Sequence, residues 1–210
     1  MSERGKLATI GVFGALLAVA LAVVLLGGDG DESPQIVTKQ GDLDPPGQVL
    51  EPGQAASVVM ETGEGSFTIR LDTEAAPKTT NSFAYLVEEG FYDGLGFHRI
   101  VPDFVIQGGD PRGDGTGGPG FKTVERPPSG LGYERGVVAM AKSGDERPGT
   151  SGSQFFVVTG AGGASLPPEY ALVGRVADGL DVVEEIGSLG GPDEKPNRTV
   201  VIEKATLENG

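Results

Sequence analysis

The chain has no cysteine and only one histidine, His98, among its 210 residues. Without cysteine there is no disulfide, no thiolate nucleophile, no cysteine-based zinc site and no lipidated cysteine. The absence does not indicate a compartment, because exported proteins need not contain disulfides. A zinc site built on one histidine would need several carboxylates, and no spacing of the H-E-x-x-H kind occurs. We therefore expect no metal and no cofactor, and a histidine that is hydrogen-bonded inside the fold.

Positive charge is also scarce. The 16 lysines and arginines face 30 acidic residues, which gives a formal net charge of -14 and a sequence pI of about 4.4. A polyanionic surface repels nucleic acid, so a nucleic-acid partner is not expected. Thirty-six glycines and 15 prolines are many for a helical protein but suit a turn-rich β protein.

Charge is missing altogether from residues 7–26, an apolar stretch long enough to cross a bilayer as a helix. Basic residues precede it and acidic residues follow it, so the positive-inside rule places residues 1–6 in the cytoplasm and the rest outside. We expect a single-pass cell-membrane protein with an extracytoplasmic domain. A cleaved signal peptide is the alternative, since Ala18-Val19-Ala20 fits an A-x-A site, but the apolar run continues beyond it.

Residues 27–54 are rich in glycine, proline and acidic side chains and lack a sustained period, which predicts a flexible acidic linker. The folded domain is expected over residues 55–210.

The membrane segment has Gly11 and Gly14 three positions apart, not the four of G-x-x-x-G, and a monomer is expected.

Hydrophobic patterns within the domain predict many short strands and two helices. Helices are expected over residues 77–89, where Pro77 suits a first turn and Gly90 a stop, and over 180–186. Strands are expected over 56–61, 65–72, two segments of 96–108, 136–141, 153–158, 170–176 and 199–207. The order favours a mainly β protein, a closed barrel with helices capping its ends, over alternating βαβ units.

Several short motifs do not carry the chemistry they suggest. The run Gly115 to Gly120 matches G-x-G-x-x-G, but Pro119 and the surrounding glycines oppose the helix that a dinucleotide site requires. Ser153 lies outside a G-x-S-x-G elbow. Asp110 and Asp114 lack the remaining ligands of a calcium loop, and we interpret them as turn residues.

Three stretches remain: FHRIVPDFVIQGGDP (97–111), GTGGPG (115–120) and SGSQFFVVT (151–159). With them the chain resembles the cyclophilin-type peptidyl-prolyl cis-trans isomerases, in a membrane-anchored, bacterial-like form. The resemblance spans about residues 55–207. It implies an eight-stranded antiparallel barrel with two helices, isomerase activity in protein folding, and proline-containing peptide segments as partners.

The resemblance also implies site residues. Arg99 of the F-H-R motif would be catalytic, together with Gln107, and the other positions would bind substrate. Those positions are Phe104, Val105, Met140, Ala141, Lys142, Gln154, Phe156, Leu166 and Tyr170.

Some positions depart from the family pattern. Val105 replaces a larger methionine often found there, and Lys142 stands where many members have asparagine. The connection over residues 142–151 is longer than usual. Ser165 takes the place of a tryptophan found in cyclosporin-sensitive members, so we expect weak cyclosporin binding.

The residue types suit the reaction. Rotation about an X-Pro bond meets a barrier of about 18–20 kcal/mol from amide resonance, and no covalent bond changes. A fixed arginine can hydrogen-bond the nitrogen lone pair or the carbonyl oxygen of the twisted amide. Phe104, Phe156 and Leu166 can form an apolar slot for the proline ring. Taken alone, each of these residues would have a structural explanation; the joint pattern favours a site.

Two other classes of function stay open. The domain could be a prolyl-peptide binding module or chaperone with weak catalysis, tethered to the membrane. It could also be a structural adaptor in which the linker and the acidic surface do the work.

Overall fold

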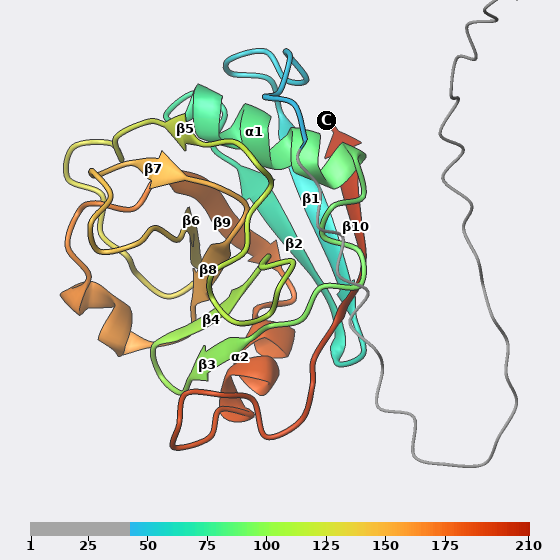
Figure 1. Ribbon diagram of the computed structural model, residues 1–210, viewed down its shortest axis with the longest axis vertical. Helices are drawn as coiled ribbons and strands as arrows, with labels where there is room; N and C mark the ends of the chain where they lie inside the picture. The colour runs from blue at the N-terminus through green and yellow to red at the C-terminus, as the bar shows by residue number, and fades with distance from the viewer. Residues whose placement is uncertain (1–42) are drawn as a thin grey trace, which may run out of the picture. The chain divides into compact units, whose positions relative to one another are not determined.

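The computed structural model describes residues 43–210, so the expected membrane segment over residues 7–26 lies outside the described part and stays a prediction. Within the described residues, no helix has both the length and the apolar character needed to cross a membrane. The described chain forms ten strands, two α-helices and one 3-10 helix (Figure 1).

Strands predominate along the chain, and the two α-helices are well separated in sequence. In chain order the elements are β1 (Ala56–Thr62), β2 (Gly65–Leu71), α1 (Pro77–Glu88), β3 (Arg99–Val101), β4 (Val105–Gly108), β5 (Thr123–Val124), β6 (Val137–Met140), β7 (Thr150–Ser151), β8 (Phe155–Val158), η1 (Ala161–Ser165), β9 (Leu172–Asp178), α2 (Leu180–Ser188) and β10 (Ile202–Asn209).

Eight of the strands form one antiparallel sheet in the order β10-β1-β2-β9-β6-β8-β4-β3. The edge strands of this sheet are β3 and β10. The segment before β3 and the segment before β10 pair through an isolated bridge between Gly96 and Val201. Backbone hydrogen bonds from Phe97 N to Val200 O and from Ile202 N to Leu95 O extend this junction. The curved sheet is thus joined at its edges by a short junction rather than by a long ladder.

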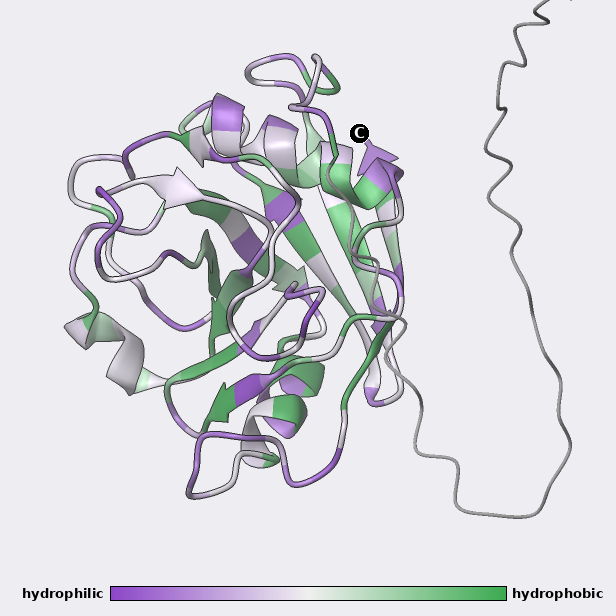
Figure 2. Ribbon diagram, in the orientation of Figure 1, coloured by the Kyte–Doolittle hydropathy of each residue, from purple (hydrophilic) through white to green (hydrophobic). Residues whose placement is uncertain are grey.

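The alternation of the strands explains the core. In β1, Val58 and Met60 are fully buried, and in β2 Phe67 and Ile69 are buried beside them, while the residues between are more exposed. Figure 2 shows the same alternation of apolar and polar positions along these strands. Because side chains of a strand point alternately to its two faces, the apolar set lies inside the curved sheet.

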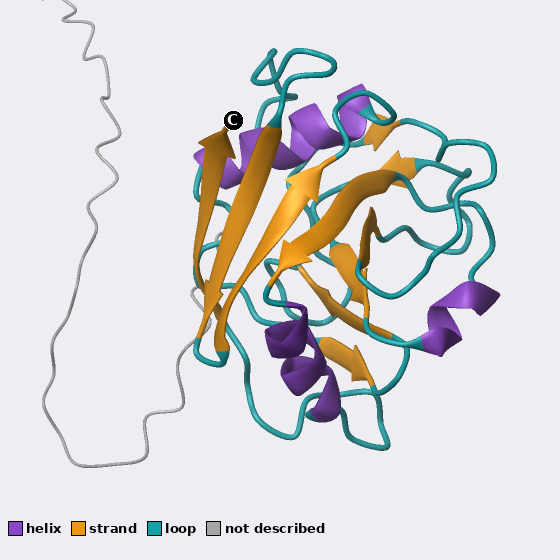
Figure 3. Cartoon of the chain, turned by 180° about the vertical axis from the view of Figure 1, so that it is seen from behind, coloured by secondary structure: helices purple, strands orange, loops and turns teal. Residues whose placement is uncertain are grey.

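The two helices lie at opposite ends of the sheet (Figure 3). Helix α1 begins at Pro77, and Glu125 from a distant loop accepts hydrogen bonds from Lys78 N and Thr79 N, so a side chain far along the sequence caps its first turn. Helix α2 places Val183 and Ile186 in the main core. The eight antiparallel strands and the two helices predicted from the sequence are confirmed; the pair of β5 and β7 is an addition.

Ordered packing begins before residue 55. Leu50, which the sequence places in the linker, is 4 % exposed and belongs to the main core. The Asn81 side chain on α1 accepts hydrogen bonds from Val49 N and Leu50 N and donates one to Gly47 O. The last part of the expected linker is therefore attached to the domain.

Candidate active site

A row of side chains crosses four neighbouring strands. Arg99 on β3 is the cross-strand partner of Gln107 on β4, Gln107 is the partner of Phe156 on β8, and Phe156 is the partner of Ala139 on β6. Directly paired residues of neighbouring strands project to the same face. The sheet register therefore brings together an arginine, an amide and an aromatic ring from segments that lie far apart in the sequence.

A pocket of about 230 Å³ opens at this row. Nine of the eleven residues predicted for the site line it: Arg99, Phe104, Val105, Gln107, Ala141, Lys142, Phe156, Leu166 and Tyr170. Phe156 and Val105 are buried and belong to a smaller apolar cluster, against which Phe104, Leu166 and Tyr170 pack. Apolar side chains make up most of the lining and two cationic residues, Arg99 and Lys142, complete it, so the pocket suits a small apolar ring next to a polar backbone.

The Arg99 guanidinium is held on three sides. Its Nε donates to Glu194 Oε2 at 2.7 Å, its Nη1 donates to Gln107 Oε1 at 3.4 Å, and its Cζ lies 5.9 Å from the centre of the Phe104 ring. The ion pair with Glu194 offsets part of the desolvation free energy of a charge that lies beside apolar residues. The arginine is thus fixed at the rim with part of its surface open to the pocket.

The amide of Gln107 continues this network. Its Nε2 donates to Gln154 Oε1 at 3.1 Å, and Gln154 Nε2 donates to the carbonyl oxygens of Gly115 and Gly117, each at 3.0 Å. Gln154 is not among the residues that line this first pocket; it lines the adjoining polar pocket and hydrogen-bonds Gln107, which lines both. The glycine-rich stretch is a loop whose carbonyls hold this amide, which is the structural role favoured over a nucleotide site.

Asp110 shapes that loop. Its carboxylate is fully buried and accepts hydrogen bonds from Arg112 N and Gly115 N, as expected of a turn residue. A Cβ at Gly117 would collide with Asp110 Oδ1, so a side chain there would break the turn. No group of three or more potential metal ligands occurs within residues 43–210.

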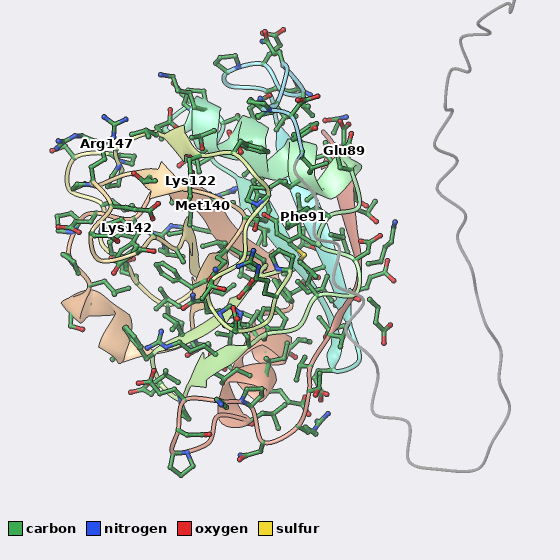
Figure 4. The ribbon with its side chains drawn as sticks, viewed as in Figure 1. Glu89, Phe91, Lys122, Met140, Lys142 and Arg147 are labelled. Atoms are coloured by element: carbon green, nitrogen blue, oxygen red, sulfur yellow. The ribbon has the colours of Figure 1, made fainter. Side chains whose placement is uncertain are left out.

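A second, more polar pocket of about 180 Å³ adjoins the first and shares Gln107, Ala141 and Lys142 with it. The Lys142 side chain is only 4 % exposed, and its Nζ lies 3.0 Å from Glu169 Oε2 and 3.1 Å from Glu146 O. Figure 4 labels Lys142 together with Lys122, which pairs with Glu146 across this pocket. Burial raises the pKa of the Glu146 carboxyl, but hydrogen bonds from Lys122 and from the Ser143 N–H lower it by more, so the pKa of Glu146 is lowered overall.

Two aromatic rings, Phe156 and Tyr170, form the far wall of the first pocket, and a third ring, Tyr133, packs behind Tyr170. Phe156 and Tyr170 pack edge to face with centroids 5.3 Å apart, and Tyr133 lies 5.8 Å from Tyr170. The Tyr133 hydroxyl donates to Tyr170 O at 2.8 Å and accepts from Tyr170 N at 2.9 Å. Burial raises the pKa of Tyr133 to about 12, so its proton stays in place at neutral pH.

Tyr133 and Glu194 were not predicted as site residues. Tyr133 is buried and supports Tyr170 from behind, without lining the pocket itself. Glu194 comes from the loop between α2 and β10. Neither residue belongs to the motif stretches, and only the three-dimensional structure brings them to the site.

The structure does not bring Met140 to the pocket. It was predicted to bind substrate, but it is 1 % exposed, belongs to the main core and lines neither pocket. The cause is the two-residue period of β6: Val138 and Met140 point into the main core, whereas Ala139 points to the pocket side and Ala141, just after the strand, lines the pocket.

The interpretation of His98 also changes. Its Nδ1 is buried, and among the described residues it has no hydrogen-bond partner, so the hydrogen-bonded histidine expected from the sequence is not found at that atom. Burial lowers the pKa of His98; the negative charge of Asp110 opposes this shift, the charge of Arg99 adds to it, and Asp114 opposes it.

The family model for cyclophilin type peptidyl-prolyl cis-trans isomerases matches residues 57–207. Peptidyl-prolyl cis-trans isomerase-like 1 of Gibberella zeae is 41 % identical over 156 residues, which cover 72 % of this chain and 94 % of that protein. A protein named probable peptidyl-prolyl cis-trans isomerase B of Mycobacterium tuberculosis is 35 % identical over 196 residues, or 84 % of this chain and 62 % of that one.

Solved structures agree with the sequence comparison. A cyclophilin type peptidyl-prolyl cis-trans isomerase of Cryptosporidium parvum superposes with a TM-score of 0.68 at 29 % identity, covering 74 % of this chain and 99 % of that one. Nearly the whole of that relative is therefore matched. The chain belongs to the cyclophilin family and is a peptidyl-prolyl cis-trans isomerase.

Proposed function

We propose that the enzyme accelerates X-Pro rotation by electrostatic stabilisation from Arg99 beside the apolar pocket, with Gln107 as its partner. The observation that carries the proposal is the placement of the Arg99 guanidinium at the rim of a pocket lined by Phe104, Phe156 and Leu166. A fixed cation next to an apolar ring site matches what a twisted prolyl amide presents: an apolar ring and a newly basic nitrogen.

The reaction follows from this arrangement. The proline ring enters the apolar pocket and is held there, while the residue before proline turns with its carbonyl. As the amide twists, its nitrogen becomes pyramidal and regains a lone pair that amide resonance had delocalised. Arg99 donates a hydrogen bond to that nitrogen or holds the neighbouring carbonyl oxygen, for which the rigid fork of guanidinium donors is suited. Gln107 keeps the guanidinium directed at the pocket.

The substrates in this proposal are proline-containing segments with little selectivity beyond proline. In support, the solved structure of the Cryptosporidium parvum relative in the presence of the dipeptide Ala-Pro superposes on this chain with a TM-score of 0.67 at 29 % identity. The predicted apolar segment over residues 7–26 would tether the domain outside the cell membrane, and exported or cell-envelope proteins would be its clients. Protease added to intact cells should then remove the domain, and complete protection would contradict the topology.

The role of Arg99 is tested by isomerisation of an Ala-Pro peptide with the full chain in detergent micelles. Arg99→Ala should lower the rate about a hundredfold, because the loss of one preorganised donor costs about 3 kcal/mol of transition-state stabilisation. Arg135→Ala is the matched control, since Arg135 also pairs with a glutamate but lies outside the pocket. Circular dichroism checks the folding of both variants. A folded Arg99→Ala variant that keeps the wild-type rate would refute the role of Arg99.

A further inference from the structure

Glu194 lies in the loop between α2 and β10, in a backbone conformation that is fixed from several sides. It has a φ of 63°, in the left-handed region that non-glycine residues rarely adopt. Its carbonyl accepts a hydrogen bond from Ile100 N at 2.8 Å, and its own N–H donates to Gly191 O at 3.1 Å. Strained backbone of this kind persists where the surroundings determine it and often serves a site. The loop is therefore bonded to β3 next to Arg99.

The Glu194 side chain meets the guanidinium on one edge only. Its Oε2 accepts from Arg99 Nε, the nitrogen nearest the arginine stem, while Gln107 accepts from Nη1. A guanidinium has five N–H donors, and these two bonds leave three. The remaining donors are at the tip of the side chain, which lines the pocket. Glu194 thus restrains the arginine without taking the atoms that a substrate would use.

We propose that Glu194 is a positioning residue for Arg99, holding the guanidinium in the orientation in which it meets the prolyl amide. The inference rests on the proposed role of Arg99. An arginine side chain loses conformational entropy when it is held in one orientation. An ion pair formed before the substrate binds means that this entropy is already lost in the free enzyme and is not lost again on binding. Both side chains are partly exposed, 34 % for Arg99 and 54 % for Glu194, so the pair itself adds little stability. Its effect should therefore show in catalysis rather than in folding.

The test is a double-mutant cycle measured as kcat/KM on the Ala-Pro peptide. Glu194→Ala should lower kcat/KM about three- to fivefold, the range expected for losing a partly exposed ion pair of up to about 1 kcal/mol. Glu194→Gln keeps an acceptor oxygen and should restore part of the loss. Both replacements keep a Cβ, so the strain of the left-handed backbone is unchanged, as it would not be with glycine.

Asp193→Asn is the matched control, because it removes one negative charge from the same loop and Asp193 makes no ion pair with Arg99. It should leave kcat/KM unchanged. In the Arg99→Ala background, Glu194→Ala should have no further effect, since there is no guanidinium left to orient.

The outcomes separate the two proposals. An equal loss from Glu194→Ala with and without Arg99 would mean that Glu194 acts through the loop structure, and the inference would be overturned. A gain in kcat/KM would show that Glu194 sequesters the arginine, which also overturns it. If Arg99→Ala lowers the rate and Glu194→Ala does not, only the positioning role fails. If Arg99→Ala itself has no effect, the proposed function fails and the inference with it.

Discussion

Tyr133→Phe is a substitution that removes one oxygen and two hydrogen bonds. The hydroxyl both donates to and accepts from the backbone of Tyr170, which lines the first pocket. Phenylalanine keeps the ring and its packing against Phe156, at a centroid distance of 6.2 Å. The change therefore isolates the link between a buried side chain and the position of the pocket wall.

The expected magnitude follows from what is left unpaired. Tyr170 N–H and C=O would lose their partner at the buried hydroxyl, and a buried unpaired group costs about 1–3 kcal/mol. Because Tyr170 is only partly buried, water can reach some of this backbone, and we expect a loss of about 1–2 kcal/mol in the free energy of unfolding. If about 1 kcal/mol of that is needed to re-form the wall when peptide binds, KM rises about fivefold.

Urea denaturation and Ala-Pro isomerisation measure the two effects. Tyr92→Phe is the control, since Tyr92 is also fully buried and its hydroxyl donates to Ser153 O, but it lies in the main core. The control should lose stability without a change in KM. Equal KM changes in both variants, or no change in Tyr133→Phe, would refute the view that Tyr133 positions the pocket wall.

Three further predictions concern single positions. Burial lowers the pKa of His98, so the folded state resists protonation of this residue and the free energy of unfolding should fall as the pH drops below about 6.5. NMR titration of this single histidine should give a pKa below that value. The variant His98→Gln should remove its part of the pH dependence above about pH 5. Glu125→Ala should cost about 1–2 kcal/mol in urea denaturation, because Lys78 N and Thr79 N lose their cap, whereas an unchanged midpoint would contradict that role. Cyclosporin should inhibit the wild type weakly, and Ser165→Trp should strengthen inhibition about tenfold, or 1.4 kcal/mol; equal inhibition of both would exclude Ser165 as the cause.

Local patterns were sufficient for most of the fold. The strands β1 and β2 alternate apolar and polar residues, and their buried sets follow that period. Helix α1 begins at Pro77, as the sequence predicts, and ends within two residues of the expected Gly90 stop. These elements are determined by residues a few positions apart, which is the range over which a sequence pattern is informative. The pair of β5 and β7 has two residues in each strand, too few for any period to show.

The part of the site that lies within one motif was predictable from the sequence. The residues that contact this part from distant segments of the chain were not. Arg99, Phe104 and Gln107 belong to one hairpin, so a single stretch of sequence indicates all three. Met140 shows the limit of such transfer: a strand has two faces, and being in the right strand does not determine which face a residue takes.

Tyr133 and Glu194 show the other limit, because each hydrogen-bonds a residue far along the chain, Tyr170 and Arg99 respectively. Neither contact follows a sequence period, since each joins segments that are brought together only by the complete fold. The motif thus supplies residues that line the pocket, while the residues that we propose to orient them come from segments whose positions only the complete fold determines. On the proposed roles of Tyr133 and Glu194, substitutions at these two positions should change rate and affinity while the motif stays the same.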